Sequence, residues 1–434
     1  MTAVTSIMDP EPPRFFPSDI VNIIMTNLVG GKNYLTGADL TSLERRDLAA
    51  CALVSSTFYL PSRRYFFSTM KIKLDVGSTT NTAGVLVEIL TANPMLQELG
   101  RHLVVAYMDP TSGSPLMNRV GNGEIVNGDN LDHVIRLLPA LRKLTIASSL
   151  PSRVSYFNQE ALSPLRDLRA LCPHIHSLIL SNISGVSTEF IHHWKDVTDL
   201  CLDNVYFADK YRDGLDMAAL LDHGVSNTPR LERLYIFGIM KCPPELRNAV
   251  LIRQLQHLHL EIHPQTVDLA VSDAVHLVNA TSSSLNRLSL TRFANEEWLE
   301  LISQSVFTKI KNLELIEKNP QKNPFPGIAI FLTPLNMNTI SRMQILTISY
   351  TGPYYSIPSI FHPIFGWTDL DALWTGPQYA HLTRLNVQLT FTAAAALGEG
   401  EKRALTEHAR SLLPLVTSTR RIALDFSVDF THST

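Results

Sequence analysis

The apolar positions of this 434-residue chain follow two different patterns. Near the N-terminus, apolar residues recur at helical spacing, and the first such run follows a capping signal at Ser18 and Asp19. Its apolar positions are Ile20, Ile23, Ile24 and Leu28. From residue 141 onward, the pattern apolar-x-x-apolar-x-apolar recurs instead. The chain therefore divides into a helical start and a long repetitive part.

The helical start consists of three short segments within residues 14–68. They are 15–28, Leu48–Ser55 and a basic and aromatic run that begins after Pro61 and ends near Phe67. We expect a disordered lead over residues 1–13 and an inserted loop over 29–43. Three short helices bury little apolar surface, so this module needs a partner or a larger body to pack against. A strand is expected at Met70–Leu74 and a helix over 81–93.

The repeat has nine clear matches, whose first residues are 22 to 39 positions apart. The matches are Leu141-Leu144-Ile146, Ile175-Leu178-Leu180, Val197-Leu200-Leu202, Leu231-Leu234-Ile236, Leu255-Leu258-Leu260, Leu285-Leu288-Leu290, Ile310-Leu313-Leu315, Met343-Leu346-Ile348 and Leu382-Leu385-Val387. Weaker matches lie at Leu103–Val105 and Ile422–Leu424. Each predicts a short strand, several of them after a helix-like run, and such units bury their apolar faces only when stacked. The fold class is therefore an α/β repeat over residues 69–434: an irregular leucine-rich-repeat solenoid with strands on the concave face and helices outside.

A doubly wound α/β domain is the alternative fold, because it also alternates helices and strands. Its strands would be buried on both faces and would have longer apolar runs. Here the leucines alternate with Thr, Glu, His, Ser and Asn, which leaves one strand face polar.

The composition of the chain excludes several classes of function. Hydrophobic residues make up 45% of the chain and charged residues 18%, which is typical of a protein with a large core. The net charge is −3 and no basic stripe is present, so we expect no nucleic-acid partner. The four cysteines form no CxxC pair, which favours a reduced compartment, cytoplasmic or nuclear. We expect no signal peptide and no membrane partner, since no apolar run reaches 18 residues.

Catalytic and nucleotide-binding motifs are not found, so we expect a non-catalytic chain without cofactor or metal. One polar set needs an interpretation: His257, His259, Glu261 and His263 alternate, so a strand would place them on one face. They could bind a metal or sense pH. Along one strand they would lie about 7 Å apart, which suits tetrahedral coordination poorly. The alternative is that they are simply solvated.

A second region with two interpretations is the aromatic-rich segment 350–378. Its members are Tyr350, Tyr354, Tyr355, Phe361, Phe365, Trp367 and Trp374. They could form a binding ridge, because aromatic side chains are enriched at recognition hot spots. They could equally form a small hydrophobic core beneath a long loop.

The N-terminal module resembles the F-box, and most closely the F-box-like leucine-rich-repeat proteins abundant in fungi. The matching segments are Phe16–Leu28, Leu48–Phe58 and Arg63–Phe67, and the more specific parts are the Pro17-x-Asp19-Ile20 opening and Leu53-Val54-Ser55. The chain departs from the family at Phe16, where leucine is usual, and in the length of the loop at 29–43. A phenylalanine also replaces the tryptophan often found in the third segment.

This resemblance implies the substrate-recognition subunit of a Skp–cullin–F-box ubiquitin ligase. The module would bind a Skp-type adaptor and through it a cullin, while the repeats would hold a target protein. The residues implied for adaptor binding are Pro17, Ile20, Ile24, Leu28, Leu53, Val54 and Phe58. Two other functions stay open: a repeat scaffold that binds proteins outside any ligase, and a receptor that depends on a small ligand.

Overall fold

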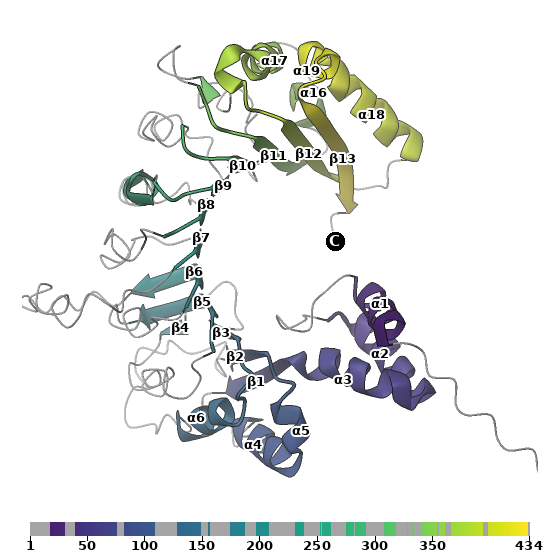
Figure 1. The fold of residues 1–434 in the computed structure, drawn as a ribbon, viewed down its shortest axis with the longest axis vertical. Coiled ribbons are helices and arrows are strands. Elements are labelled where there is room, and N and C mark those ends of the chain that lie inside the picture. Colours follow the sequence, from purple (N-terminus) through teal and green to yellow (C-terminus); the bar gives the residue numbers. More distant parts are fainter. Residues whose placement is uncertain are drawn as a thin grey trace, which may run out of the picture. The chain divides into compact units, whose positions relative to one another are not determined.

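A computed structural model of the chain describes nineteen tracts or single residues. They are 18–30, 40–75, 82–108, 128–148, 155–156, 174–186, 197–207, 231–237, 252, 254–261, 275–281, 283–291, 308–317, 328, 332–333, 340–353, 356–360, 366–393 and 398–432. The chain forms two compact units, Met1–Thr145 with Ala170–Ile175 and Ile146–Arg169 with His176–Thr434. Figure 1 shows the elements of both, and each unit is described by itself.

The first unit begins with three helices, which confirms the three predicted helical segments but changes their bounds. They are α1 (Ser18–Leu28), α2 (Ser42–Val54) and α3 (Ser56–Ser68). Helix α2 begins earlier than expected because Thr41 and Glu44 form a capping box. The Thr41 hydroxyl accepts the Glu44 N–H at 3.3 Å, and the Glu44 carboxylate accepts the Thr41 N–H at 2.6 Å. The predicted loop at 29–43 therefore overruns the start of α2, and its residues 31–39 lie outside the described residues.

Helix α3 contains Pro61, so the prediction that this helix begins after the proline is wrong. Proline lacks the N–H that would bond one turn back, which normally weakens a helix interior. Packing outweighs that loss here, because α3 buries Ser62, Tyr65 and Ser68 along one face.

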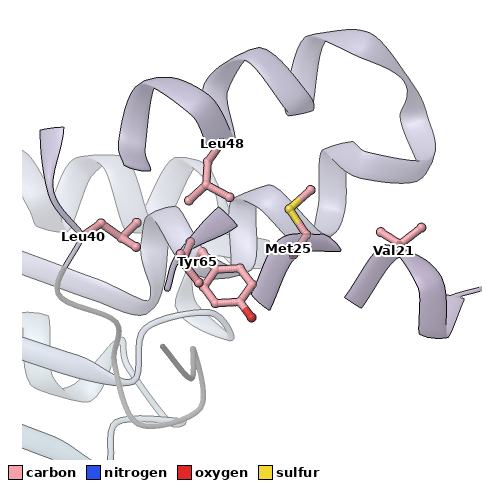
Figure 2. Close-up of a cluster of buried hydrophobic side chains, with 6 residues drawn as sticks. Val21, Met25, Leu40, Leu48 and Tyr65 are labelled. Atoms are coloured by element: carbon pink, nitrogen blue, oxygen red, sulfur yellow. The ribbon is translucent and has the colours of Figure 1, made fainter. Parts of the chain in front are cut away.

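The three helices share a small hydrophobic core, drawn in Figure 2. Its buried side chains are Val21, Met25, Val29, Leu40, Leu48 and Tyr65. Leu28, Cys51, Phe58 and Phe66 pack against this cluster while partly exposed. We call these six buried residues the module core. Among the described residues of the module, six buried apolar side chains are few for an independent domain, as the sequence indicated.

The rest of the first unit continues into the sheet. Strand β1 (Thr69–Asp75) pairs in parallel with β2 (His102–Met108). Strand β3 (Lys143–Ser148) follows β2 in the strand order, and the division between the two units falls within it, after Thr145. The helices are α4 (Thr82–Ala92), α5 (Pro94–Gln97) and α6 (Gly128–Arg136). These confirm the predicted strand at Met70–Leu74 and the predicted helix over 81–93.

The second unit contains most of the repeats. Its strands are β4 (Ser155–Tyr156), β5 (Ser177–Val186), β6 (Asp199–Phe207), β7 (Arg233–Phe237), β8 (His257–Glu261), β9 (Arg287–Thr291), β10 (Asn312–Glu317), β11 (Ile345–Pro353), β12 (Arg384–Ala393) and β13 (Ala423–His432). From β5 to β13 they pair in parallel in chain order, and β4 pairs with β5. Chain order excludes the doubly wound alternative, in which the strand order reverses.

The register confirms the leucine-rich repeat. Equivalent leucines of neighbouring strands are Cα partners, as in the series Leu200, Leu234, Leu258 and Leu288. The apolar residues of all nine matches are buried, while the residues between them form a more polar face. At β13 the alignment differs from the weak match, since Leu424 and Phe426 pair with Leu385 and Val387. The predicted placement of strands on a concave face with helices outside stays a prediction.

Aromatic residues fill the C-terminal part of the second unit. The helical elements there are α16 (Ile357–Ile360), α17 (Trp367–Thr375), η7 (Pro377–Tyr379), α18 (Glu399–Ser411) and α19 (Pro414–Ser418). Tyr350, Trp367 and Trp374 are at most 1% exposed, and the Trp367 ring lies 6.3 Å from that of Phe426 on β13. For these three residues the small-core interpretation is right and the binding-ridge interpretation is wrong. The other members of the aromatic set lie outside the described residues.

Candidate functional site

The N-terminal module exposes large apolar side chains away from its core. Leu53 is 89% exposed and Val54 76%, and five further residues of the three-helix region are at least 38% exposed. We call this set the apolar module surface; its members are Ile20, Ile23, Leu43, Leu53, Val54, Tyr59 and Leu60. Single exposed apolar residues are common in folded proteins, and the presence of several on three packed helices makes this set a candidate interaction site.

Helix geometry explains this exposure. In α1, Val21 and Met25 lie one turn apart and face the module core, so Ile20 and Ile23 lie on the other side of the helix. In α2, Leu48 faces the core, and Leu53 and Val54 follow in the last turn on other faces. Ser55 then adopts an extended conformation, with φ −159° and ψ 158°, and α3 begins at once.

The structure divides the residues predicted for adaptor binding into three groups. Ile20, Leu53 and Val54 are exposed, and Ile24 is half-buried. Leu28 and Phe58 pack against the module core. Pro17 lies outside the described residues. Adaptor contact at these positions stays a prediction.

Four members of the apolar module surface were missed by the sequence interpretation: Ile23, Leu43, Tyr59 and Leu60. Ile23 shares a helix face with Ile20, so the periodicity of α1 could have identified it. The predicted loop at 29–43 includes Leu43, and the capping box at Thr41 and Glu44 is the sequence signal that places Leu43 in α2 instead. Tyr59 also contacts Arg63, whose guanidinium donates to the Tyr59 hydroxyl at 2.8 Å.

A second candidate surface is the polar side of strands β6–β10. In register, His257 of β8 lies between Arg233 of β7 and Arg287 of β9. Each arginine forms an ion pair with a carboxylate of an adjacent strand, Arg233 with Asp199 and Arg287 with Glu314, the latter at 2.9 Å. These pairs cross-link neighbouring repeats and leave both arginine side chains about half exposed.

The two histidines of β8 contact side chains of the adjacent strands β7 and β9. The Tyr235 hydroxyl lies 3.3 Å from Nδ1 of His257, and the Thr291 hydroxyl lies 3.2 Å from Nε2 of His259. The Phe237 ring lies 4.8 Å from that of His259. Burial, followed by the nearby Arg287 charge, lowers the pKa of His257 to about 4. His257 is therefore neutral near pH 7.

The same surface holds Glu314 in its charged form. Burial alone would raise the pKa of Glu314, but hydrogen bonds from Ser289 at 2.6 Å and from Arg287 lower it. Among the described residues, no group of three His, Cys, Asp or Glu side chains could hold a metal ion. His263 lies outside them. This surface can make charged and aromatic contacts but shows no nucleophile and base in place for catalysis.

No helix in the part of the chain that the structure describes is long and apolar enough to cross a membrane.

Comparisons with known proteins identify no family for this chain. No protein-family model matches this sequence, and no curated protein matches it. Among solved structures, the chain is similar to an internalin from Listeria monocytogenes, at 12% sequence identity and a TM-score of 0.31. The match covers 80% of this chain and 89% of that chain. A likeness of this extent carries no conclusion about function, and the repeat character rests on the strand order and register.

Proposed function

We propose that this chain is the substrate-recognition subunit of a Skp–cullin–F-box ubiquitin ligase, acting in the cytoplasm or nucleus. Its N-terminal module binds a Skp-type adaptor, and its repeats bind a target protein. The observation that carries the proposal is the apolar module surface, above all the exposure of Leu53 and Val54 at 89% and 76%. Both residues belong to the Leu-Val-Ser segment that resembles the F-box.

Burial energetics support docking at this surface. Transfer of one large apolar side chain from water into a protein interface contributes about 1.5–3 kcal/mol. The module core offers only six buried side chains, so coverage by an adaptor would also stabilise the module itself. A small core beside exposed apolar residues is what a docking module requires.

The repeats supply the second half of the proposal. The polar side of β6–β10 presents two half-exposed arginines together with Tyr235 and the β8 histidines, a mixture suited to protein recognition. The chain makes and breaks no bond in this role. It raises the effective concentration of target lysines near the ubiquitin-conjugating enzyme by tethering.

Affinity purification with mass spectrometry under proteasome inhibition tests both halves at once. The wild-type chain should recover an adaptor, a cullin and a ubiquitin-conjugated target. The double variant Leu53→Asp with Val54→Asp should lose adaptor and cullin but keep the target, because the repeats are unchanged. If the wild-type chain recovers a target but no adaptor, the ligase proposal is contradicted. That result would favour a repeat scaffold that binds proteins outside any ligase.

A further inference from the structure

Strand β13 has an outer edge that no described strand covers. It is the last strand in the sheet order and pairs with β12 over all ten of its residues. In Figure 1 it is the outermost strand of the second unit's sheet. Edge strands offer backbone N–H and C=O groups to any extended chain, and proteins usually shield them.

The hydrogen bonds of β13 show which residues face this edge. The Ala423 N–H donates to the Thr383 carbonyl at 2.8 Å, so the backbone of Ala423 points toward the preceding repeat. Backbone direction alternates along a strand in a parallel ladder. The backbone groups of Leu424, Phe426 and Val428 therefore point outward.

The side chains beside this edge define the chemistry of an added strand. Asp425 and Asp429 lie on one face of β13 and are exposed, Asp425 to 66% of its side chain. On the other face Phe426 and Val428 are buried and Leu424 is half-buried. Arg384 reaches Asp425 only at 3.9 Å. One face of an incoming strand would thus meet negative charge, and the other would extend an apolar layer.

We propose that the outer edge of β13 binds an extended segment of a partner protein in which basic and apolar residues alternate. The backbone of the segment pairs with Leu424, Phe426 and Val428. Its lysine or arginine side chains lie beside Asp425 and Asp429, and its apolar side chains continue the layer formed by Phe426 and Val428. This interaction site is separate from the adaptor surface and does not depend on it.

The same charges disfavour one register of pairing with a second copy of this chain. Antiparallel pairing of two β13 strands centred on Ser427 would put Asp425 of each copy opposite Asp429 of the other. Like charges directly opposite each other destabilise a strand pair. The two aspartates therefore favour a basic segment and act against self-pairing in the register centred on Ser427.

Fluorescence anisotropy with a labelled peptide of alternating lysine and valine tests the proposal. The full chain should bind this peptide and not its counterpart with glutamate for lysine. Val428→Pro removes an outward N–H without removing a bond to β12, so binding should weaken at least about tenfold. Val428→Ala is the matched control, because it removes side-chain volume but keeps the N–H, and it should weaken binding clearly less than Val428→Pro does. Asp425→Asn with Asp429→Asn should weaken binding by about tenfold at low salt.

Circular dichroism of each variant establishes that the fold is retained. Equal binding by Val428→Pro and Val428→Ala, or no binding by the wild-type chain, would overturn the proposal. Light scattering that shows a wild-type dimer dissociated by Val428→Pro would also overturn it, because a second copy would then occupy the edge.

Discussion

The hydroxyl of Tyr235 lies 3.3 Å from Nδ1 of His257 on the adjacent strand, and the two rings meet edge to face with centroids 5.1 Å apart. Burial raises the pKa of Tyr235, so its hydroxyl stays protonated near pH 7 and lies within hydrogen-bond distance of the imidazole. The pair joins β7 to β8 on the polar side of the repeats, and it makes the charge state of His257 part of the stability of the fold.

Stability should therefore fall in mild acid through His257. Its pKa is about 4 in the folded chain against an ordinary value of 6.5, so the unfolded chain binds the proton first as pH falls. Stability from this group is complete above pH 6.5 and is lost as pH falls toward 4. One pKa unit corresponds to about 1.4 kcal/mol, and the ring is only half-buried, so we expect a loss on the order of 1–2 kcal/mol.

Urea unfolding at pH 7 and pH 5 measures this effect. Other groups titrate over the same range, so the informative quantity is the difference between the wild-type chain and His257→Gln. The variant should lose less stability on acidification. An identical loss in both proteins would show that His257 does not titrate as described.

Asp371 should be a strong determinant of stability in the second unit. Its buried carboxylate, on α17, accepts the backbone N–H groups of Leu415 at 2.7 Å and Val416 at 2.8 Å, and so caps α19 from another helix. Asp371→Ala leaves both N–H groups without an acceptor and should destabilise the fold by about 1–3 kcal/mol. Asp369→Ala changes an exposed carboxylate of the same helix and should cost less than about 0.5 kcal/mol. Chemical denaturation that gives equal midpoints for the two variants would exclude the capping role.

The module core should be sensitive to truncation. Met25 is fully buried, so Met25→Ala should lower the free energy of unfolding by about 2–5 kcal/mol. This is a large loss for a module whose core consists of six side chains. Hydrogen exchange should accelerate across α1–α3 while β5–β12 stay protected. Ile23→Ala, on the exposed side of α1, should leave exchange unchanged. Faster exchange in the repeats as well would mean that the module and the repeats unfold together.

Asn182 and Asn204 form a further link between repeats. The Asn204 side-chain amide donates to the Asn182 side-chain oxygen at 2.9 Å, and both residues have positive φ, 55° and 52°. Asn204→Ala should cost about 1–2 kcal/mol, because it loses the hydrogen bond and strains the backbone. Asn204→Gly loses only the bond and should be the more stable variant in urea unfolding. The opposite order would show that backbone strain is unimportant there.

The repeats could be predicted from the sequence because each strand has its own alternation of apolar and polar residues. Leu258 and Leu260 alternate with polar residues, and the same spacing recurs in every unit, so the strands could be placed without knowledge of their neighbours. Pro61 shows the limit of such rules. A proline ordinarily favours the first turn of a new helix, but tertiary packing around Tyr65 keeps α3 continuous through Pro61.

The candidate site was less accessible to sequence reasoning, because exposure depends on contacts between helices. Leu28, Leu53 and Phe58 are all apolar residues of the module, yet only the packing of α1–α3 decides that Leu53 is exposed and the other two are not. Pairs such as Tyr235 with His257 likewise depend on register between repeats, which neither repeat encodes alone.

Calorimetric titration of the full chain with a purified Skp-type adaptor tests the central claim most directly. We expect the wild-type chain to bind, and we expect Leu53→Asp with Val54→Asp to bind at least about 100-fold more weakly, because two apolar side chains contribute about 3–6 kcal/mol on burial. Met95→Asp is the matched control: Met95 is 64% exposed in the same unit but lies outside the module, so it should bind as wild type. Absence of binding by the wild-type chain, or undiminished binding by the double variant, would contradict the assignment of the N-terminal helices as an adaptor-docking module.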